Sequence, residues 1–213
     1  MVGKDWSIGV ERLIITPHLA WYHLPKTAGT TTDQLFVASG VPLLWHDQQD
    51  SPIKHLPPAQ HPEGDALPLD GKHKVVNFRR LPHWLLSNYQ HKLGMMGLEL
   101  DAAPMASGLF WRERDQTWLP ADWWVERLGI DETWTLLRVE HLKSDFLRFL
   151  QLHEPICRRA RWRVRLVGSR NRNRYRRKLK DWFSVDDLQC LYQANPRWAA
   201  LERKAYGNLI TSI

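Results

Sequence analysis

The chain has 213 residues, of which 43% are hydrophobic and 25% charged, so we expect one globular domain spanning residues 1–213. Lysine and arginine outnumber aspartate and glutamate by 30 to 23, and no apolar stretch approaches the length of a bilayer span. Cys157 and Cys190 are the two cysteines and stand far apart, which excludes a disulfide scaffold and a cysteine-based zinc site. The first residues do not resemble a secretory signal, so we expect a cytoplasmic protein without a membrane span.

Strands alternate with helices along the chain. The first half of the chain predicts a strand at 18–24 (HLAWYHL), a helix at 31–39 ended by Gly40, a strand at 41–46 (VPLLWH) and a long loop at 47–72. A strand at 74–78 (KVVNF), a helix from Pro82 to Leu93 ended by Gly94 and an irregular stretch at 95–118 follow. The second half predicts a helix at 121–128, a strand at 134–139, a helix at 142–152, a helix capped by Ser184 and a helix from Pro196 to Tyr206. This alternation predicts an α/β fold with a mostly parallel sheet.

The loop after the first predicted strand has the composition of an anion site. In the segment LPKTAGTTT (24–32), Ala28 and Gly29 let the backbone approach a ligand, and the following helix N-terminus offers unpaired N–H groups. Lys26 adds a full charge, and Thr30 to Thr32 add hydroxyl donors. The order of Lys and Gly differs from a Walker A loop, which disfavours a magnesium-dependent nucleotide hydrolase.

A second strand–helix junction, VVNFRRLPHWLLSNY (75–89), adds a further candidate contact. Arg79 leaves the end of the strand, and Ser87 lies about two turns into the helix. Because the ends of adjacent parallel strands meet at one rim of a sheet, both side chains are candidates to hold a second phosphate.

Together, PKTAGTT and the later FR…LLSNY resemble the sulfotransferases that use 3′-phosphoadenosine 5′-phosphosulfate (PAPS), above all the carbohydrate-type and bacterial members. The resemblance implies a three-layer α/β sandwich with a central, mostly parallel sheet, related to the P-loop NTPase fold. It also implies that the first loop binds the 5′-phosphosulfate through residues Lys26, Thr27, Ala28, Gly29, Thr30 and Thr31.

In the same family an Arg and a Ser eight residues later bind the 3′-phosphate, which implies this role for Arg79 and Ser87. The family often carries Arg-Asp-Pro with a second Arg five positions after the first. Here Pro82 is displaced by one position, so Arg80 is an alternative to Arg79, and Trp84 stands where the second Arg would be. Weaker likenesses are the segment LLRVEHLKSDF with Glu140 and the ending WAALERKAYG.

The implied reaction is in-line transfer of the sulfuryl group to an acceptor hydroxyl, without a metal, leaving adenosine 3′,5′-bisphosphate. Lys26 would stabilise the bridging oxygen as the S–O bond breaks, and a histidine would act as base. Our preferred base is His55, in a stretch (IKHLPPAQ) that resembles the family's GH-x-P, and the alternatives are His46, His61 and His23.

The excess of positive charge lies in one segment, residues 158–180, which holds twelve basic residues and no acidic one. Without it the chain would have 18 basic and 23 acidic residues, a net charge of −5. This segment is either a solvated basic surface or a surface for an anionic partner. Arg170, Asn171 and Arg172, or residues near Tyr175, could close over PAPS, whereas an acidic glycan acceptor would use the same surface.

Two other functions compete with the sulfotransferase hypothesis. A nucleic-acid-binding module would use the arginine-rich segment 158–180 with its interleaved Trp and Tyr, although we consider nucleic acid the less favoured partner. A kinase-like enzyme would need a Walker loop and a metal carboxylate, neither of which is evident. The preferred acceptor is a small molecule or a glycan.

Overall fold

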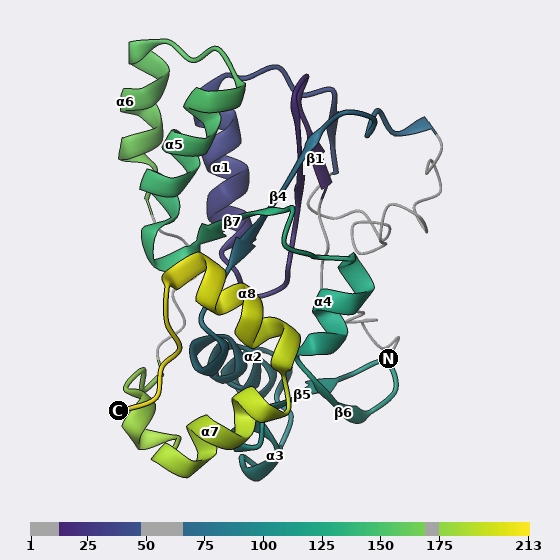
Figure 1. The fold of residues 1–213 in the computed structure, drawn as a ribbon, viewed down its shortest axis with the longest axis vertical. Helices are drawn as coiled ribbons and strands as arrows, with labels where there is room; N and C mark the ends of the chain where they lie inside the picture. The colour runs from purple at the N-terminus through teal and green to yellow at the C-terminus, as the bar shows by residue number, and fades with distance from the viewer. Residues whose placement is uncertain (1–12, 48–65, 169–174) are drawn as a thin grey trace, which may run out of the picture.

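A computed structural model describes residues 13–47, 66–168 and 175–213, and its centre is a five-stranded mixed sheet (Figure 1). The strands, in their order across the sheet, are β3 (Trp45–His46), β1 (Leu13–Ile15), β2 (Leu19–Tyr22), β4 (His73–Phe78) and β7 (Thr135–Arg138). β2, β4 and β7 pair in parallel, whereas β1 pairs antiparallel with both β2 and β3. The α/β class is confirmed, but the expectation of a mostly parallel sheet is wrong, because half of the strand pairings are antiparallel.

Helices cover both faces of the sheet. The helices of more than one turn are α1 (Gly29–Ser39), α2 (Leu81–Met96), α4 (Asp122–Leu128), α5 (Leu142–His153), α6 (Arg158–Leu166), α7 (Val185–Gln193) and α8 (Pro196–Tyr206). α1, α5 and α6 contribute to the hydrophobic cluster on one face, and α2, α4, α7 and α8 contribute to the cluster on the other. The described chain therefore has three layers, with the sheet between two groups of helices (Figure 1).

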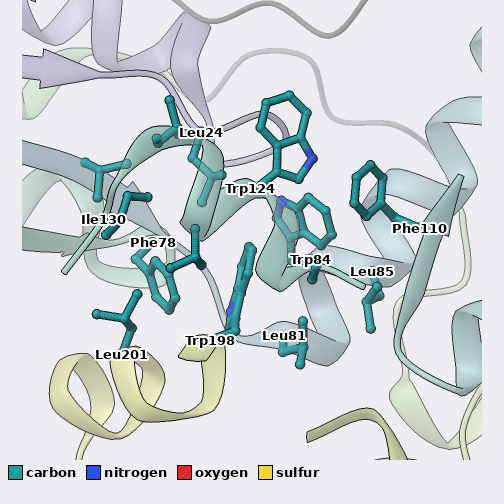
Figure 2. Close-up of a cluster of buried hydrophobic side chains, with 14 of the residues drawn as sticks. Leu24, Phe78, Leu81, Trp84, Leu85, Phe110, Trp124, Ile130, Trp198 and Leu201 are labelled. Atoms are coloured by element: carbon teal, nitrogen blue, oxygen red, sulfur yellow. The ribbon is translucent and has the colours of Figure 1, made fainter. Parts of the chain in front are cut away.

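Side chains of the short strand β2 point alternately to the two faces of the sheet, and all four are buried, so the strand contributes to both cores. Leu19 and Trp21 of β2 belong to the cluster beneath α1, whereas Ala20 and Tyr22 belong to the opposite cluster. That second cluster contains many aromatic side chains, and in it Trp84 packs against Phe110 and Trp198 (Figure 2). The ring centroids of Trp84 and Trp198 are 4.8 Å apart, so much of the tryptophan content forms core.

The stretch at 95–118 is more ordered than its sequence suggested. α2 continues past Gly94 to Met96 and ends at Gly97, whose φ of 64° suits a glycine cap. The short helix α3 (Ala103–Ala106) follows, and then β5 (Leu109–Arg112) and β6 (Thr117–Pro120) form an antiparallel hairpin. Trp111 and Trp118 face each other across the hairpin, with ring centroids 5.5 Å apart.

The C-terminal helices agree with their sequence signals. Ser184 and Asp187 form a reciprocal capping box at the start of α7, and α8 begins at Pro196 and ends at Gly207. The basic segment contains the helix α6 rather than only a loop. Among the described residues, no helix combines the length and the apolarity needed to cross a bilayer.

Candidate functional site

The loop between β2 and α1 has an unusual backbone. Lys26 and Ala28 adopt left-handed conformations, with φ of 62° and 66°, although neither is glycine. Ala28 stands directly before α1, and no side chain caps the first turn of this helix. A helix start without a side-chain cap leaves backbone N–H groups and a partial positive charge available to an anion.

Neighbouring polar side chains hold this loop in place. The Thr27 hydroxyl donates to the Leu24 carbonyl (2.5 Å). The Asn77 amide, from β4, donates to the Thr27 carbonyl (2.8 Å) and to the Thr32 hydroxyl (2.6 Å). The Thr32 hydroxyl also donates to the Ala28 carbonyl (3.3 Å), so the expectation that it is free to donate to a ligand is wrong. These bonds fix the loop from within, and the backbone N–H groups of Thr31 and Thr32 donate to the same Ala28 carbonyl (3.0 and 3.1 Å).

Gly29 brings His23 to the start of α1. A Cβ atom on Gly29 would lie 2.3 Å from the His23 Nε2, which is far inside contact distance. His23 in turn stacks on Trp21, with ring centroids 5.6 Å apart. A residue without a side chain is therefore required at position 29 for His23 to occupy this place.

Arg79 lies against the loop from the end of β4. Its Nη1 donates to the Lys26 carbonyl (3.4 Å), and its buried Nε has no hydrogen-bond partner among the described residues. Burial, and then the charge of Arg79, lowers the pKa of Lys26 to about 8. Neither cation forms an ion pair within the described ranges. Two cations without a counter-charge favour the binding of an anionic ligand at this loop.

Arg80 has a different role from Arg79. It donates to the carboxylate of the fully buried Glu202 (3.3 Å) and to the Asn208 side chain (2.8 Å). Its guanidinium also lies over the Tyr206 ring, 4.4 Å from the centroid. Arg80 thus connects the start of α2 to α8, which leaves Arg79 as the arginine at the loop.

Helix α2 supplies the remaining expected residues. Ser87 is buried two turns into this helix. Within the described residues its hydroxyl makes no hydrogen bond, either to Arg79 or to another residue. Trp84, at the position of the family's second Arg, is fully buried and donates its indole N–H to the Pro25 carbonyl (2.7 Å). Trp84 therefore supports the loop from beneath instead of contacting a ligand.

Two residues near Lys26 were not expected from the sequence. Lys92 is buried on α2 and forms an ion pair with Glu113, from the β5–β6 hairpin. Burial, and then the charge of Lys26, lowers the pKa of Lys92 to about 8. Burial, and then the charges of Lys26 and Lys92, lower the pKa of His91 to about 4. A sequence feature that could have identified His91 is its spacing from Ser87, because residues four positions apart share a helix face.

The candidate bases have different surroundings. The preferred His55, with His61, lies outside the described residues, as do Arg170, Asn171 and Arg172. His46 is in β3 and its Nε2 contacts the Asp33 carboxylate of α1 (2.5 Å). His23 is the candidate that the structure places against the first residue of α1.

A pocket of about 460 Å³ lies between the start of α2 and the segment that follows α8. It is lined by the side chains of Arg80, His83 and Glu140 and by residues 208–212. Glu140 accepts a hydrogen bond from the Tyr206 hydroxyl. Burial, and then the charge of Arg79, lowers the pKa of His83, one of the residues that line this pocket. No group of three potential ligands for a metal ion occurs in the described ranges.

The chain matches no protein-family model, no curated protein and no solved structure. A functional inference therefore depends on the geometry and electrostatics of the loop, Lys26 and Arg79.

Proposed function

We propose that the protein is a sulfotransferase that moves the sulfuryl group of PAPS to an acceptor hydroxyl. The observation that carries the proposal is the pairing of Lys26 with Arg79. These two cations come from the ends of neighbouring parallel strands, lie beside the uncapped start of α1, and lack a carboxylate partner within the described residues. PAPS has anionic groups at two positions, which suits two such cations.

Each part of the loop has a role in this proposal. The backbone of Thr27, Ala28, Gly29, Thr30 and Thr31 would surround the 5′-phosphosulfate, with Lys26 at the oxygen that bridges phosphorus and sulfur. Arg79, assisted by Ser87, would hold the 3′-phosphate. The fold would then be the P-loop-like sulfotransferase fold, altered by the antiparallel strand β1 inserted between β2 and β3.

In the transfer, the bond between sulfur and the bridging oxygen breaks while a bond forms between sulfur and the acceptor oxygen. Lys26 would stabilise the negative charge that develops on the departing oxygen. The acceptor's proton would pass to a histidine. His55 remains the preferred candidate, and His23 is an alternative that lies within the described residues. The acceptor is proposed to be a small molecule or a glycan.

The test is a thermal-shift titration with adenosine 3′,5′-bisphosphate, followed by PAPS turnover with a panel of hydroxyl acceptors. We expect stabilisation by the bisphosphate, and an affinity about ten to a hundred times weaker in Lys26→Ala and Arg79→Ala, because each removes a charged contact to a phosphate. Arg203→Ala is the matched control, since Arg203 is an exposed arginine of α8. Stabilisation by ATP without any by the bisphosphate would overturn the proposal.

A further inference from the structure

Helix α6 has a charged outer face that the proposed function does not use. Its sequence, RRARWRVRL, contains five arginines and no acidic residue. Ala160 and Val164 are buried, and Val164 belongs to the cluster that α1 and α5 share. α6 is the outermost of these helices, at the upper left of Figure 1, so its remaining sides face outward.

Apolar side chains lie in the middle of this outer face. Trp162 is 62% exposed and Leu166 is 61% exposed. They are four residues apart and so project from the same side of the helix, as does Arg158 one turn earlier. Successive residues rotate by about 100°, which places Trp162 opposite the buried pair Ala160 and Val164. Among the tryptophans in the described ranges, Trp162 is the one with an exposed side chain.

Exposure of these apolar side chains to water costs free energy, which several tryptophans in the described ranges avoid by burial. Trp21, Trp84 and Trp198 are fully buried. Single exposed apolar side chains are common on protein surfaces, but apolar side chains that lie next to one another, as Trp162 and Leu166 do on α6, are typical of interaction or membrane sites. Leu152, 76% exposed at the end of α5, adds a further apolar side chain directly before the turn that leads into α6.

We propose that α6 docks the protein on a membrane surface that contains anionic phospholipids. Its arginines would contact the lipid phosphates, while Trp162 and Leu166 would insert among the headgroups, in the manner of an interfacial amphipathic helix. The charge of the helix is complementary to such a surface. A polyanion such as RNA would also attract the arginines and stack on Trp162, but it offers nothing apolar to bury Leu166 and Leu152. The aliphatic side chains are therefore the reason to infer lipid.

The test uses the full chain and measures co-sedimentation with vesicles of phosphatidylcholine alone or with about 30% phosphatidylserine, at about 0.15 M salt. We expect binding to the mixed vesicles and little to phosphatidylcholine. The variant Arg158→Gln/Arg159→Gln/Arg165→Gln should weaken binding on the order of a hundredfold, because each basic residue near an anionic surface contributes to the attraction. The matched control, Arg176→Gln/Lys178→Gln/Arg203→Gln, removes the same charge from exposed residues outside α6 and should change binding about threefold or less.

The apolar contribution is tested separately. Trp162→Ala and Leu166→Ser alter exposed positions, so both variants should unfold at the wild-type temperature and bind mixed vesicles about tenfold more weakly. Equal losses in the α6 and control arginine variants would show unspecific attraction and overturn the proposal. The proposal would also be overturned if the protein bound a single-stranded RNA oligonucleotide tightly through α6 and did not bind the mixed vesicles. None of these measurements depends on sulfuryl transfer, so this inference and the proposed function can fail independently.

Discussion

The indole N–H of Trp84 donates to the carbonyl oxygen of Pro25 over 2.7 Å and thereby joins helix α2 to the loop that precedes α1. Both groups are buried, and Trp84 also packs against Phe110 and Trp198. The same helix therefore contributes to the core and sets the position of the candidate anion site.

Replacing Trp84 by Phe should lower the free energy of unfolding by about 1–3 kcal/mol, because the Pro25 carbonyl loses its donor and the smaller ring leaves space. Urea denaturation measures this change, and the affinity for adenosine 3′,5′-bisphosphate should fall with it. Trp111→Phe is the matched control, since Trp111 lies in the β5–β6 hairpin and makes no hydrogen bond to the described loop between β2 and α1. Equal stability of the two variants would contradict a supporting role for Trp84.

Gly29→Ala should weaken bisphosphate binding, because the added Cβ would lie 2.3 Å from the His23 ring and one of the two must move. The double variant Gly29→Ala/His23→Ala removes this clash. Its melting temperature should return to that of His23→Ala or exceed it, since alanine favours a helix over glycine by about 1 kcal/mol. A Gly29→Ala protein as stable as the wild type would indicate that His23 is not fixed against α1.

Arg80 and Arg79 should differ when each is replaced by alanine. Arg80→Ala leaves the fully buried Glu202 without its cation and should cost about 3 kcal/mol of stability, part of which Glu202→Gln restores. Arg79→Ala should leave stability unchanged or slightly higher, because it removes a positive charge beside Lys26. Chemical denaturation of the three variants tests this. Loss of stability in Arg79→Ala alone would reverse the two assignments.

The pH dependence of bisphosphate binding should report Lys26. Since burial and Arg79 lower the pKa of Lys26 to about 8, its ammonium group is charged below that pH and becomes neutral above it. Affinity should therefore fall as the pH rises from about 7 to about 9.5, by several-fold. Lys26→Arg keeps its charge over this range and should flatten the profile. Calorimetric titrations at several pH values provide the measurement, and an equally steep profile in Lys26→Arg would assign the proton to another group.

Local signals in the sequence were sufficient for the loop and for several helices. The apolar run before Pro25 and the small residues after Lys26 predict a strand–loop–helix, and the structure has one. Ser184 and Pro196 likewise mark the starts of α7 and α8. In each case a few neighbouring residues determine the conformation through capping or periodicity.

Features that depend on distant pairing were missed. β1 has only three residues and becomes a strand through its partners β2 and β3, which makes the sheet mixed. The ion pair of Lys92 with Glu113 arises because the β5–β6 hairpin packs near α2. The choice between Arg79 and Arg80 is made by Glu202, 122 residues after Arg80. Such contacts leave no periodic signal in a single sequence.

Asn77 is the residue that both accepts and donates hydrogen bonds behind the loop, and no residue of similar shape can do both. Its amide accepts from Trp21 and donates to the Thr27 carbonyl and the Thr32 hydroxyl, all in the interior. An aspartate has the same outline but no N–H, and it would set a negative charge against the Thr27 carbonyl, within the loop that is proposed to bind an anion. A leucine would remove the hydrogen bonds that Asn77 makes with three groups: the Trp21 indole N–H, the Thr27 carbonyl and the Thr32 hydroxyl. If the loop binds an anion as proposed, its shape for that task depends on Asn77 of the neighbouring strand β4, a side chain that holds the loop from behind.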